Sequence, residues 1–144
     1  MILGMGIDLV DCRRFARPLT ISKERFLKRI MTDFEIGTLE KKATAWAKFL
    51  KKDSQDEQTL LSIAKIFAAK EAFVKALGTG FRDGIVMRDL EVWRDNLGKP
   101  MLRVSGKANQ ALENALPMGT EARIHLSLSD EFPYAQAQVI IDVY

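Results

Sequence analysis

The spacing of hydrophobic residues divides the chain into a helical first half and a second half rich in strands. In several short segments apolar residues recur at every second position, the spacing of a strand with one buried face. These segments predict strands over residues 2–10, 90–94, 101–104, 123–129 and 134–143. Segments without that alternation predict helices over residues 12–17, 22–31, 33–51, 59–77 and 106–116. Helices grouped before antiparallel strands indicate an α+β fold, with the sheet packed on a long central helix and shorter helices around it.

Local residue types indicate where these elements begin and end. Thr32 followed by Glu35 has the spacing of a capping box, which predicts a helix start near residue 33. Asp11 is placed to cap the helical turn after the first strand. Gly78 and Gly80 are expected to end the long helix. Polar segments and segments containing Gly or Pro predict connections over residues 51–57, 95–100 and 130–133.

Composition narrows the class of protein. The chain has 144 residues, of which 47% are hydrophobic and 28% charged, which predicts one ordinary globular domain spanning 1–144. The single cysteine, Cys12, excludes an internal disulfide and a cysteine-based zinc site. No apolar run approaches the roughly 20 residues that cross a bilayer, and no secretory signal is visible. We therefore expect a cytoplasmic protein without membrane association.

Positive charge is concentrated near the N-terminus although the net charge is only +3. The basic residues of this segment are Arg13, Arg14, Arg17, Lys23, Arg25, Lys28 and Arg29. Such a segment attracts an anionic partner, or is simply a solvated helix face. Aromatic residues do not alternate with the cations, and no nucleic-acid recognition motif is present. An acidic protein is thus a better partner for the segment than nucleic acid.

Asp8 is the first candidate for a role in chemistry. It shares one face of the first strand with Gly4 and Gly6, while Leu3, Met5, Ile7 and Leu9 occupy the other face. Glycines in a strand allow a ligand or another backbone to approach closely. Asp8 could bind such a ligand, or it could merely cap the helical turn that follows.

Glu71 and Lys75 are the next candidates, since their spacing of four places them on one face of the long helix. The surrounding residues are mostly apolar, and a buried carboxylate needs a cation. Lys75 could supply that charge, or a magnesium ion could. Asp8 and Glu71 together would be a minimal magnesium site completed by water and substrate phosphate, with Lys75 neutralising a phosphate oxygen.

His125 is the only histidine. It alternates with Arg123, Ser127 and Ser129 on one strand face, which is either a structural arrangement or an anion-binding surface. With a lone histidine and no G-x-S-x-G motif, the chain is not expected to be a nucleophilic hydrolase. It also lacks a Walker loop and a dinucleotide-binding motif, which argues against P-loop and dinucleotide chemistry.

Several segments, in order along the chain, resemble the motifs of one known family. They are Gly6–Val10 followed by Arg14, Phe26–Ile30 followed by Thr32 and Glu35, Phe67–Gly80 with the pattern F-A-A-K-E-A-x-x-K-A-L-G-T-G, Gly98–Pro100, His125–Ser129 and Tyr134–Ala137. Together they resemble the holo-acyl-carrier-protein synthases, which are small phosphopantetheinyl transferases. The resemblance covers nearly the whole chain and implies a phosphopantetheinyl-transferase-like fold.

The resemblance implies an activity and a set of site residues. Members of the family transfer phosphopantetheine from coenzyme A to a serine of apo acyl carrier protein, depend on magnesium, support fatty acid biosynthesis and form homotrimers with active sites between subunits. Carried over to this chain, the resemblance implies the following roles: Asp8 and Glu71 as metal ligands, Lys75 as a pyrophosphate contact, Gly78 and His125 as coenzyme-binding residues, and Arg14 and Arg29 as contacts for the acidic carrier protein.

Two positions depart from the family pattern. Ile66 stands where many members have an arginine, which removes one expected phosphate contact, although Lys65 precedes it. Asp130 stands where many members have a histidine. The alternative hypothesis is a non-catalytic basic module that binds an acidic protein or nucleic acid. The pairing of Asp8 with Glu71 distinguishes the two, because a binding module needs neither carboxylate.

Overall fold

The computed structural model describes residues 1–50 and 57–144, with side-chain surroundings for residues 1–44 and 57–144. Most of the loop predicted over 51–57 therefore lies outside the described residues. None of the described helices is long and apolar enough to cross a membrane.

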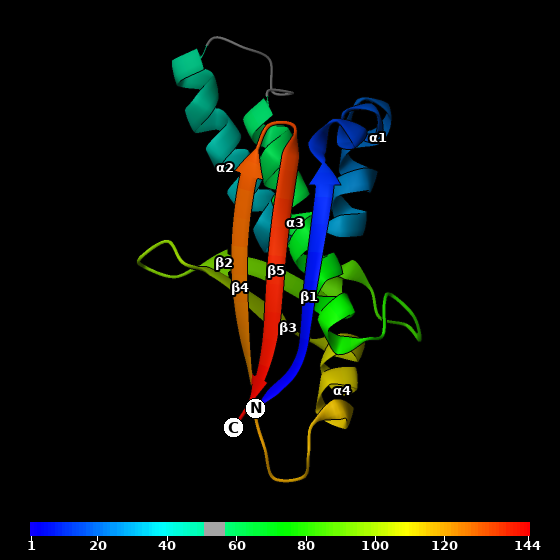
Figure 1. Cartoon of the computed structure of the whole chain (residues 1–144). Coiled ribbons are helices and arrows are strands. Elements are labelled where there is room, and N and C mark those ends of the chain that lie inside the picture. Colours follow the sequence, from blue (N-terminus) through cyan, green and yellow to red (C-terminus); the bar gives the residue numbers. More distant parts are fainter. Residues whose placement is uncertain (51–56) are drawn as a thin grey trace.

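All five predicted strands are present, in two antiparallel sheets. The larger sheet has the order β1–β5–β4 and contains β1 (Ile2–Asp11), β4 (Ala122–Glu131) and β5 (Tyr134–Val143). The smaller sheet pairs β2 (Leu90–Arg94) with β3 (Pro100–Val104). The smaller sheet crosses behind the larger one, and both chain ends lie at the same end of the larger sheet (Figure 1).

The helices also follow the sequence prediction closely. They are α1 (Ala16–Ile30), α2 (Asp33–Leu50), α3 (Glu57–Leu77) and α4 (Gly106–Ala115), with short 3-10 turns at η1 (Cys12–Phe15) and η2 (Met87–Asp89). The two basic helices predicted over 12–17 and 22–31 appear as η1 and α1, with a kink at Ser22, whose backbone is not helical (φ −158°, ψ 77°). The observed fold is α+β, as predicted.

The long helix α3 packs against β1 and β5 across one face of the larger sheet. Two glycines of β1 make this close approach possible. A Cβ atom at Gly4 would overlap the carbonyl of Ala76, and one at Gly6 would overlap the carbonyl of Ala72. The glycines of β1 therefore admit another backbone, one of the two options left open by the sequence. They bring Asp8, which follows them on the same face, beside the C-terminal half of α3.

The predicted helix boundaries are confirmed by hydrogen bonds. The backbone N–H of Thr32 donates to Glu35 (2.8 Å), and the N–H of Glu35 donates to the Thr32 hydroxyl (3.3 Å), which completes the capping box. Asp11 accepts a hydrogen bond from the N–H of Arg13 (3.0 Å). At the end of α3, Gly78 has a left-handed backbone (φ +80°). That conformation favours glycine and stops the helix.

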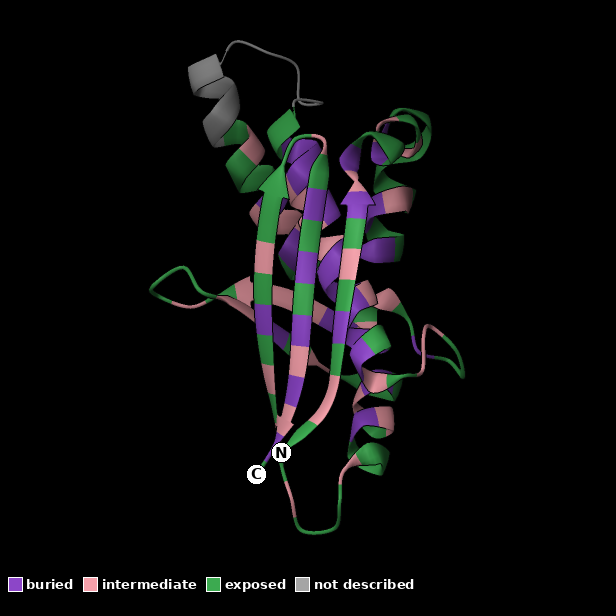
Figure 2. Cartoon of the chain, in the orientation of Figure 1, coloured by how far each residue is buried: buried purple, intermediate pink, exposed green. Residues whose placement is uncertain are grey.

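The opposite face of the larger sheet has no helix over it within the described residues (Figure 2). Met5, Ile7 and Leu9 of β1 are 64%, 52% and 64% exposed on this face. The face towards α3 holds the buried residues of β5, including Val139 and Ile141. We call the uncovered side the open sheet face.

On the edge strand β4, the prediction that three apolar residues are buried holds only in part. Leu126 is buried, whereas Ile124 and Leu128 are partly exposed.

Candidate active site

The structure brings Asp8 and Lys75 together across the contact between β1 and α3. Lys75 Nζ lies 2.7 Å from Asp8 Oδ1, and it also donates to the backbone carbonyl of Ile7 (3.1 Å). The Asp8 side chain is only 13% exposed, whereas that of Lys75 is 50% exposed. Lys75 therefore lies at the rim of the site, with its ammonium reaching inward to Asp8.

Glu71 lies one helical turn before Lys75 and is also close to Asp8. Burial raises the pKa of the Glu71 carboxyl above its ordinary value, and the nearby Asp8 carboxylate raises it further. Lys75 and Arg14 oppose that shift with their positive charges. The pairing of Glu71 with Lys75 that the spacing suggested is not the observed one, because Lys75 forms its ion pair with Asp8.

Asp8 and Glu71 are the two carboxylates of this cluster that could hold a magnesium ion. Burial, and after it the charge of Asp8, raises the pKa of Glu71, and a divalent cation between the two carboxylates would offset both effects. Among the described residues, no group of three or more His, Cys, Asp or Glu side chains is placed to hold a metal. Magnesium fits a two-carboxylate set because it retains water and accepts phosphate oxygens.

The turn after α3 leaves open space next to this cluster. The N–H of Gly78 donates to the carbonyl of Lys75 (3.1 Å), which ties the turn to the residue that contacts Asp8. No atom lies within 4 Å of the position that a Cβ would occupy at Gly78 or Gly80. An extended ligand can therefore approach the backbone here without meeting a side chain.

A groove of about 600 Å³ runs beside the cluster between α1, α3 and the segment that leads into η2. Its lining is mainly apolar, from residues that include Phe26, Ile30, Phe67, Phe81 and Ile85, with Arg14 and Arg29 at the same groove. We call it the α1 groove.

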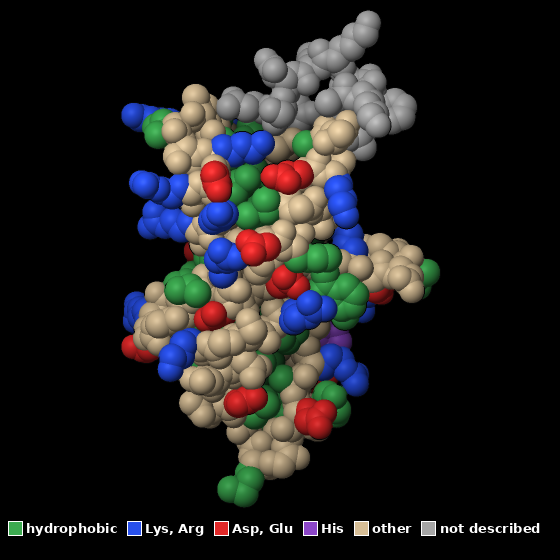
Figure 3. Space-filling view, turned by 180° about the vertical axis from the view of Figure 1, so that it is seen from behind, with side chains coloured by type: hydrophobic (Ala, Val, Ile, Leu, Met, Phe, Trp, Pro, Cys, Tyr) green, Lys and Arg blue, Asp and Glu red, His purple; other side chains and the backbone are tan. Residues whose placement is uncertain are grey.

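Arg14 connects the α1 groove to the carboxylates. Its guanidinium lies over the rings of Phe15 (5.5 Å) and Phe67 (5.2 Å), and its charge acts on Glu71. All seven basic residues predicted as an anion-attracting segment are exposed, and cations gather over α1 on the left of Figure 3. Arg14 and Arg29 both line the α1 groove, and their role as contacts for a common partner stays a prediction.

His125 does not join this cluster within one chain. It is exposed on β4, in register with Ile140 of β5 and, beyond it, Met5 of β1. These residues lie on the open sheet face, whereas Asp8 lies on the face towards α3. Alternation along the strands therefore separates the histidine from the carboxylates by the thickness of the sheet.

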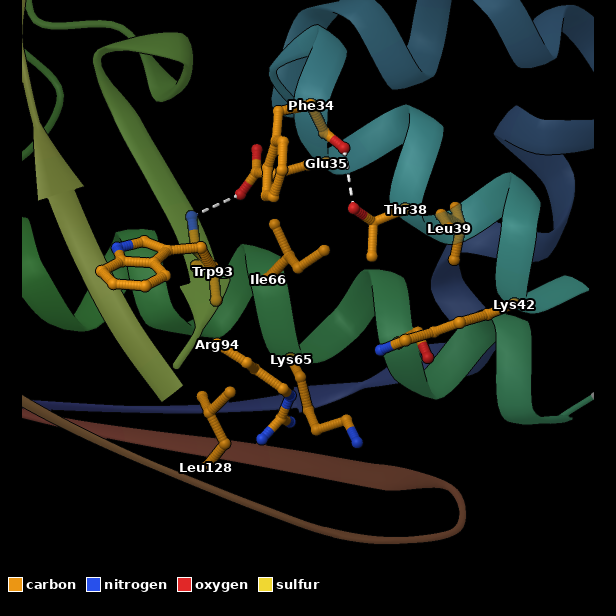
Figure 4. A pocket seen from close by; sticks show the side chains of 12 residues that line it. Phe34, Glu35, Thr38, Leu39, Lys42, Lys65, Ile66, Trp93, Arg94 and Leu128 are labelled. Atoms are coloured by element: carbon orange, nitrogen blue, oxygen red, sulfur yellow. Dashed lines mark hydrogen bonds between the residues drawn. The ribbon is translucent and has the colours of Figure 1, made fainter. Parts of the chain in front are cut away.

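A second pocket, not anticipated from the sequence, lies between α2, α3, β2 and β4. Its volume is about 290 Å³, and the side chains of Lys42, Lys65 and Arg94 reach into it from three elements (Figure 4). Burial lowers the pKa of Lys42, and the positive charges of Arg94 and Lys65 lower it further. We call it the cationic pocket.

Asp130 forms an ion pair with one cation of this pocket: its Oδ2 lies 2.6 Å from Lys65 Nζ. The residue that departs from the family pattern thus neutralises one of the three cations. Lys42 and Arg94 were missed because each is an ordinary polar residue in its own element, and only packing brings them together.

A buried ion pair was also missed. Lys70 Nζ lies 2.6 Å from Glu35 Oε1, and both side chains are 0% exposed. Lys70 lies three and four positions before the buried residues Phe73 and Val74, so helical spacing places it on the apolar face of α3. That spacing was the available signal that this lysine, and not Lys75, is the buried one.

Comparisons with known proteins agree with this architecture. A family model described as the 4'-phosphopantetheinyl transferase superfamily matches residues 4–127. The holo-[acyl-carrier-protein] synthase of Bartonella tribocorum is 46% identical over 142 residues, which cover 99% of this chain and 96% of that protein.

Solved structures give the same result. The holo-[acyl-carrier-protein] synthase of Neisseria meningitidis aligns with a TM-score of 0.75 and 34% identity over 99% of each chain. The synthase of Bacillus anthracis, solved in complex with CoA (3',5'-ADP), aligns with a TM-score of 0.71 and 30% identity, over 98% of this chain and 96% of that one. By sequence and by fold, this chain belongs to the 4'-phosphopantetheinyl transferase superfamily, among the holo-acyl-carrier-protein synthases.

Proposed function

We propose that the protein transfers phosphopantetheine from coenzyme A to a serine of apo acyl carrier protein. The observation that supports this most directly is the meeting of Asp8 and Glu71, distant in sequence, beside the ammonium of Lys75. In the reaction the serine oxygen forms a bond to the phosphorus next to pantetheine. The bond from that phosphorus to the bridging pyrophosphate oxygen breaks, and adenosine 3',5'-bisphosphate leaves while the serine proton passes to a base or to water.

Asp8 and Glu71 are the proposed magnesium ligands. A bound magnesium ion would hold the pyrophosphate oxygens and offset the charge that develops on the leaving bisphosphate. Lys75 is half exposed beside Asp8, so its ammonium can donate to the carboxylate and to a phosphate oxygen together. The open backbone at Gly78 gives the coenzyme room to pass next to Lys75.

The α1 groove is the proposed docking surface for the carrier. Acyl carrier proteins are acidic, so the exposed cations of α1 attract them from a distance, and the apolar lining can then bury a side chain of the partner. Arg14 and Arg29 are the proposed ionic contacts. Because Arg14 also acts on Glu71, docking in this groove brings the carrier serine towards the metal ligands.

The cationic pocket is the proposed site for the nucleotide end of coenzyme A. Lys65 is paired with Asp130, while the charges of Arg94 and Lys65 both act on Lys42, so an incoming phosphate would relieve repulsion among the three cations. Lys42 and Arg94 would then supply the charge that the family arginine, replaced here by Ile66, would otherwise provide.

A homotrimer is proposed as the working form, with residues 1–144 acting as one domain in each copy. Exposed Met5, Ile7 and Leu9 on the open sheet face are suited to burial against another copy. Contact between copies through this face would also place His125 beside the carboxylates of a neighbouring copy, which it cannot reach within its own chain. We place the activity in the cytoplasm, where it supports fatty acid biosynthesis.

The test is to mix the protein with coenzyme A, magnesium and apo acyl carrier protein, and to weigh the carrier by mass spectrometry. The carrier should gain one phosphopantetheine, and a carrier with its acceptor serine replaced by alanine should gain none. An unmodified carrier across a range of conditions would favour the non-catalytic basic module instead. Rates on fatty-acid carriers and on polyketide or peptide synthase carrier domains would then establish the preferred acceptor.

A further inference from the structure

The buried ion pair between Lys70 and Glu35 is the strongest polar feature that the proposed chemistry leaves unused. Besides its 2.6 Å contact with Glu35, Lys70 Nζ donates to the carbonyl of Ile30 (2.8 Å) at the end of α1. The other oxygen of Glu35 accepts from the N–H of Val92 in β2 (2.8 Å). One ion pair therefore joins α1, α2, α3 and β2.

The pair also lies between the two proposed substrate sites. Ile30, which accepts from Lys70, lines the α1 groove. Glu35 and Val92, on the other side, line the cationic pocket, where the N–H of Val92 donates to Glu35. The residue after Lys70 on α3 is Glu71, a proposed metal ligand. A single buried connection thus links a wall of each pocket to the helix that carries the carboxylate.

Stability alone is a poor explanation for such a pair. Removing two charges from water costs several kcal/mol per ion, and well-packed apolar residues often stabilise a core equally well or better. Accordingly, burial lowers the pKa of Lys70, against the opposing charge of Glu35. With the N–H of Thr32, which also donates to Glu35, the pair takes part in four hydrogen bonds. Directed bonds of this kind fix the distance between the elements that they join, which an apolar contact does not.

We propose that Lys70 and Glu35 are positioning residues that hold the α1 groove and the cationic pocket at the separation needed for transfer. The serine of a docked carrier must meet the phosphorus in line, and a displacement of about 1 Å costs on the order of 100-fold in rate. This inference rests on the proposed function, because it requires both substrates to bind at these two places. Both side chains are 0% exposed, so each acts through the walls that it connects.

The experiment removes both charges together in the double variant Lys70→Met/Glu35→Gln, which keeps similar volumes and leaves glutamine, an accepted capping-box residue, before α2. The matched control is Asp33→Asn/Arg88→Met. It removes an exposed ion pair (2.8 Å) that also joins α2 to the η2 segment, and neither of its two residues lines either pocket. Coenzyme A affinity is measured by calorimetry, carrier affinity with a carrier whose acceptor serine is alanine, and turnover by carrier mass.

The double variant should bind each substrate within about threefold of wild type, while kcat falls about 10- to 100-fold. The control should keep all three values. If the ion pair has a purely structural role, the double variant should melt at a lower temperature, and its kcat should not fall while its substrate affinities stay unchanged. If the double variant melts below the assay temperature, all proteins are assayed at a lower temperature at which circular dichroism shows each of them folded, and the same separation of kcat from binding is expected.

Two results would overturn the inference. A folded double variant with wild-type kcat would show that the pair sets no distance that matters. If the double variant loses affinity for one substrate alone, the ion pair shapes a single pocket and does not set the distance between the two pockets. Wild-type protein is assayed alongside, so failure of the proposed function is recognised separately: wild type would then leave the carrier unmodified, and the inference would fall with it.

Discussion

Asp8 and Glu71 illustrate what single residues contribute. Neither acid has an unusual setting within its own segment. The charge of Asp8 acts on Glu71 only because β1 and α3 pack against one another. The raised pKa of Glu71 records two carboxylates close together in a partly buried place. Such an arrangement is unfavourable for a purely structural purpose, so it supports the proposed magnesium site.

Replacing either carboxylate by its amide should remove activity without unfolding the protein. We expect Asp8→Asn and Glu71→Gln each to lower carrier modification about 100-fold or more, because charge stabilisation at the leaving phosphate is lost. Turnover is followed by carrier mass, and magnesium binding by calorimetry. The exposed Glu113→Gln serves as control. A variant that keeps wild-type turnover would exclude its carboxylate as a metal ligand.

Glu71 should also make stability depend on pH in the metal-free protein. Its pKa is raised above the ordinary value of 4.5, so the folded state binds the proton more tightly than the unfolded chain does. The stabilising contribution is therefore present below about pH 4.5 and is lost as pH rises through the higher folded value. In chelator at pH 7, Glu71→Gln should melt at a higher temperature than wild type.

That difference in melting temperature should disappear on acidification, because Glu71 is then protonated in both states. Thermal denaturation followed by circular dichroism from pH 4 to pH 8 would measure it. Equal melting temperatures across this range would contradict the assignment of a raised pKa to Glu71.

At the scale of elements, the contact between β1 and α3 creates the site. Gly4 and Gly6 let the strand approach the helix so closely that Asp8 and Glu71 influence one another. The α3 helix then ends at Gly78, which leaves the space beside Lys75 open. The glycines of β1, the alanines of α3 and the glycine turn after α3 therefore act together to form the site.

Gly6→Ala should therefore be strongly destabilising, by about 1–3 kcal/mol or more, because the added methyl overlaps the Ala72 carbonyl and α3 has to move. Gly37→Ala is the matched control. It lies inside α2 with no atom within 4 Å of the added Cβ, so it should stabilise by about 0.5–1 kcal/mol through helix propensity. Urea denaturation measures both, and equal effects would argue against close packing at Gly6.

At the scale of the whole molecule, the open sheet face is the surface through which the proposed homotrimer would form. Met5, Ile7 and Leu9 are exposed on it, and His125 lies on the same face. One chain therefore presents an apolar surface and a candidate coenzyme-binding residue on the side away from its own carboxylates. The proposed homotrimer, with a site shared between copies, would account for both features.

A charge on this face should disrupt the assembly. We expect Ile7→Lys to lower the molecular mass measured by light scattering and to lower carrier modification with it, since a buried lysine without a partner is costly. Met118→Lys is the control, because Met118 is fully exposed in a turn away from the sheet. An unchanged mass and unchanged activity for Ile7→Lys would argue against assembly through the open sheet face.

Much of the fold was accessible from local patterns. The strands, the capping box at Thr32 and Glu35, and the stop at Gly78 follow from interactions between near neighbours in the chain, which the sequence records directly. Asp8, Glu71 and Lys75 were identified as candidates for the same reason. The motif assigns His125 to the coenzyme site, and this stays a prediction. Within one chain, the strand face that carries His125 points away from Asp8.

The sequence by itself determined the elements, the family and the acids and cations available for chemistry, since these depend on residue type and short-range spacing. Only the tertiary structure decided which charges meet. It paired Lys75 with Asp8, buried Lys70 against Glu35, and gathered Lys42, Lys65 and Arg94 around one pocket. Partners of this kind are chosen by the packing of helices and strands distant along the chain, and that packing depends on shape and burial summed over the whole core.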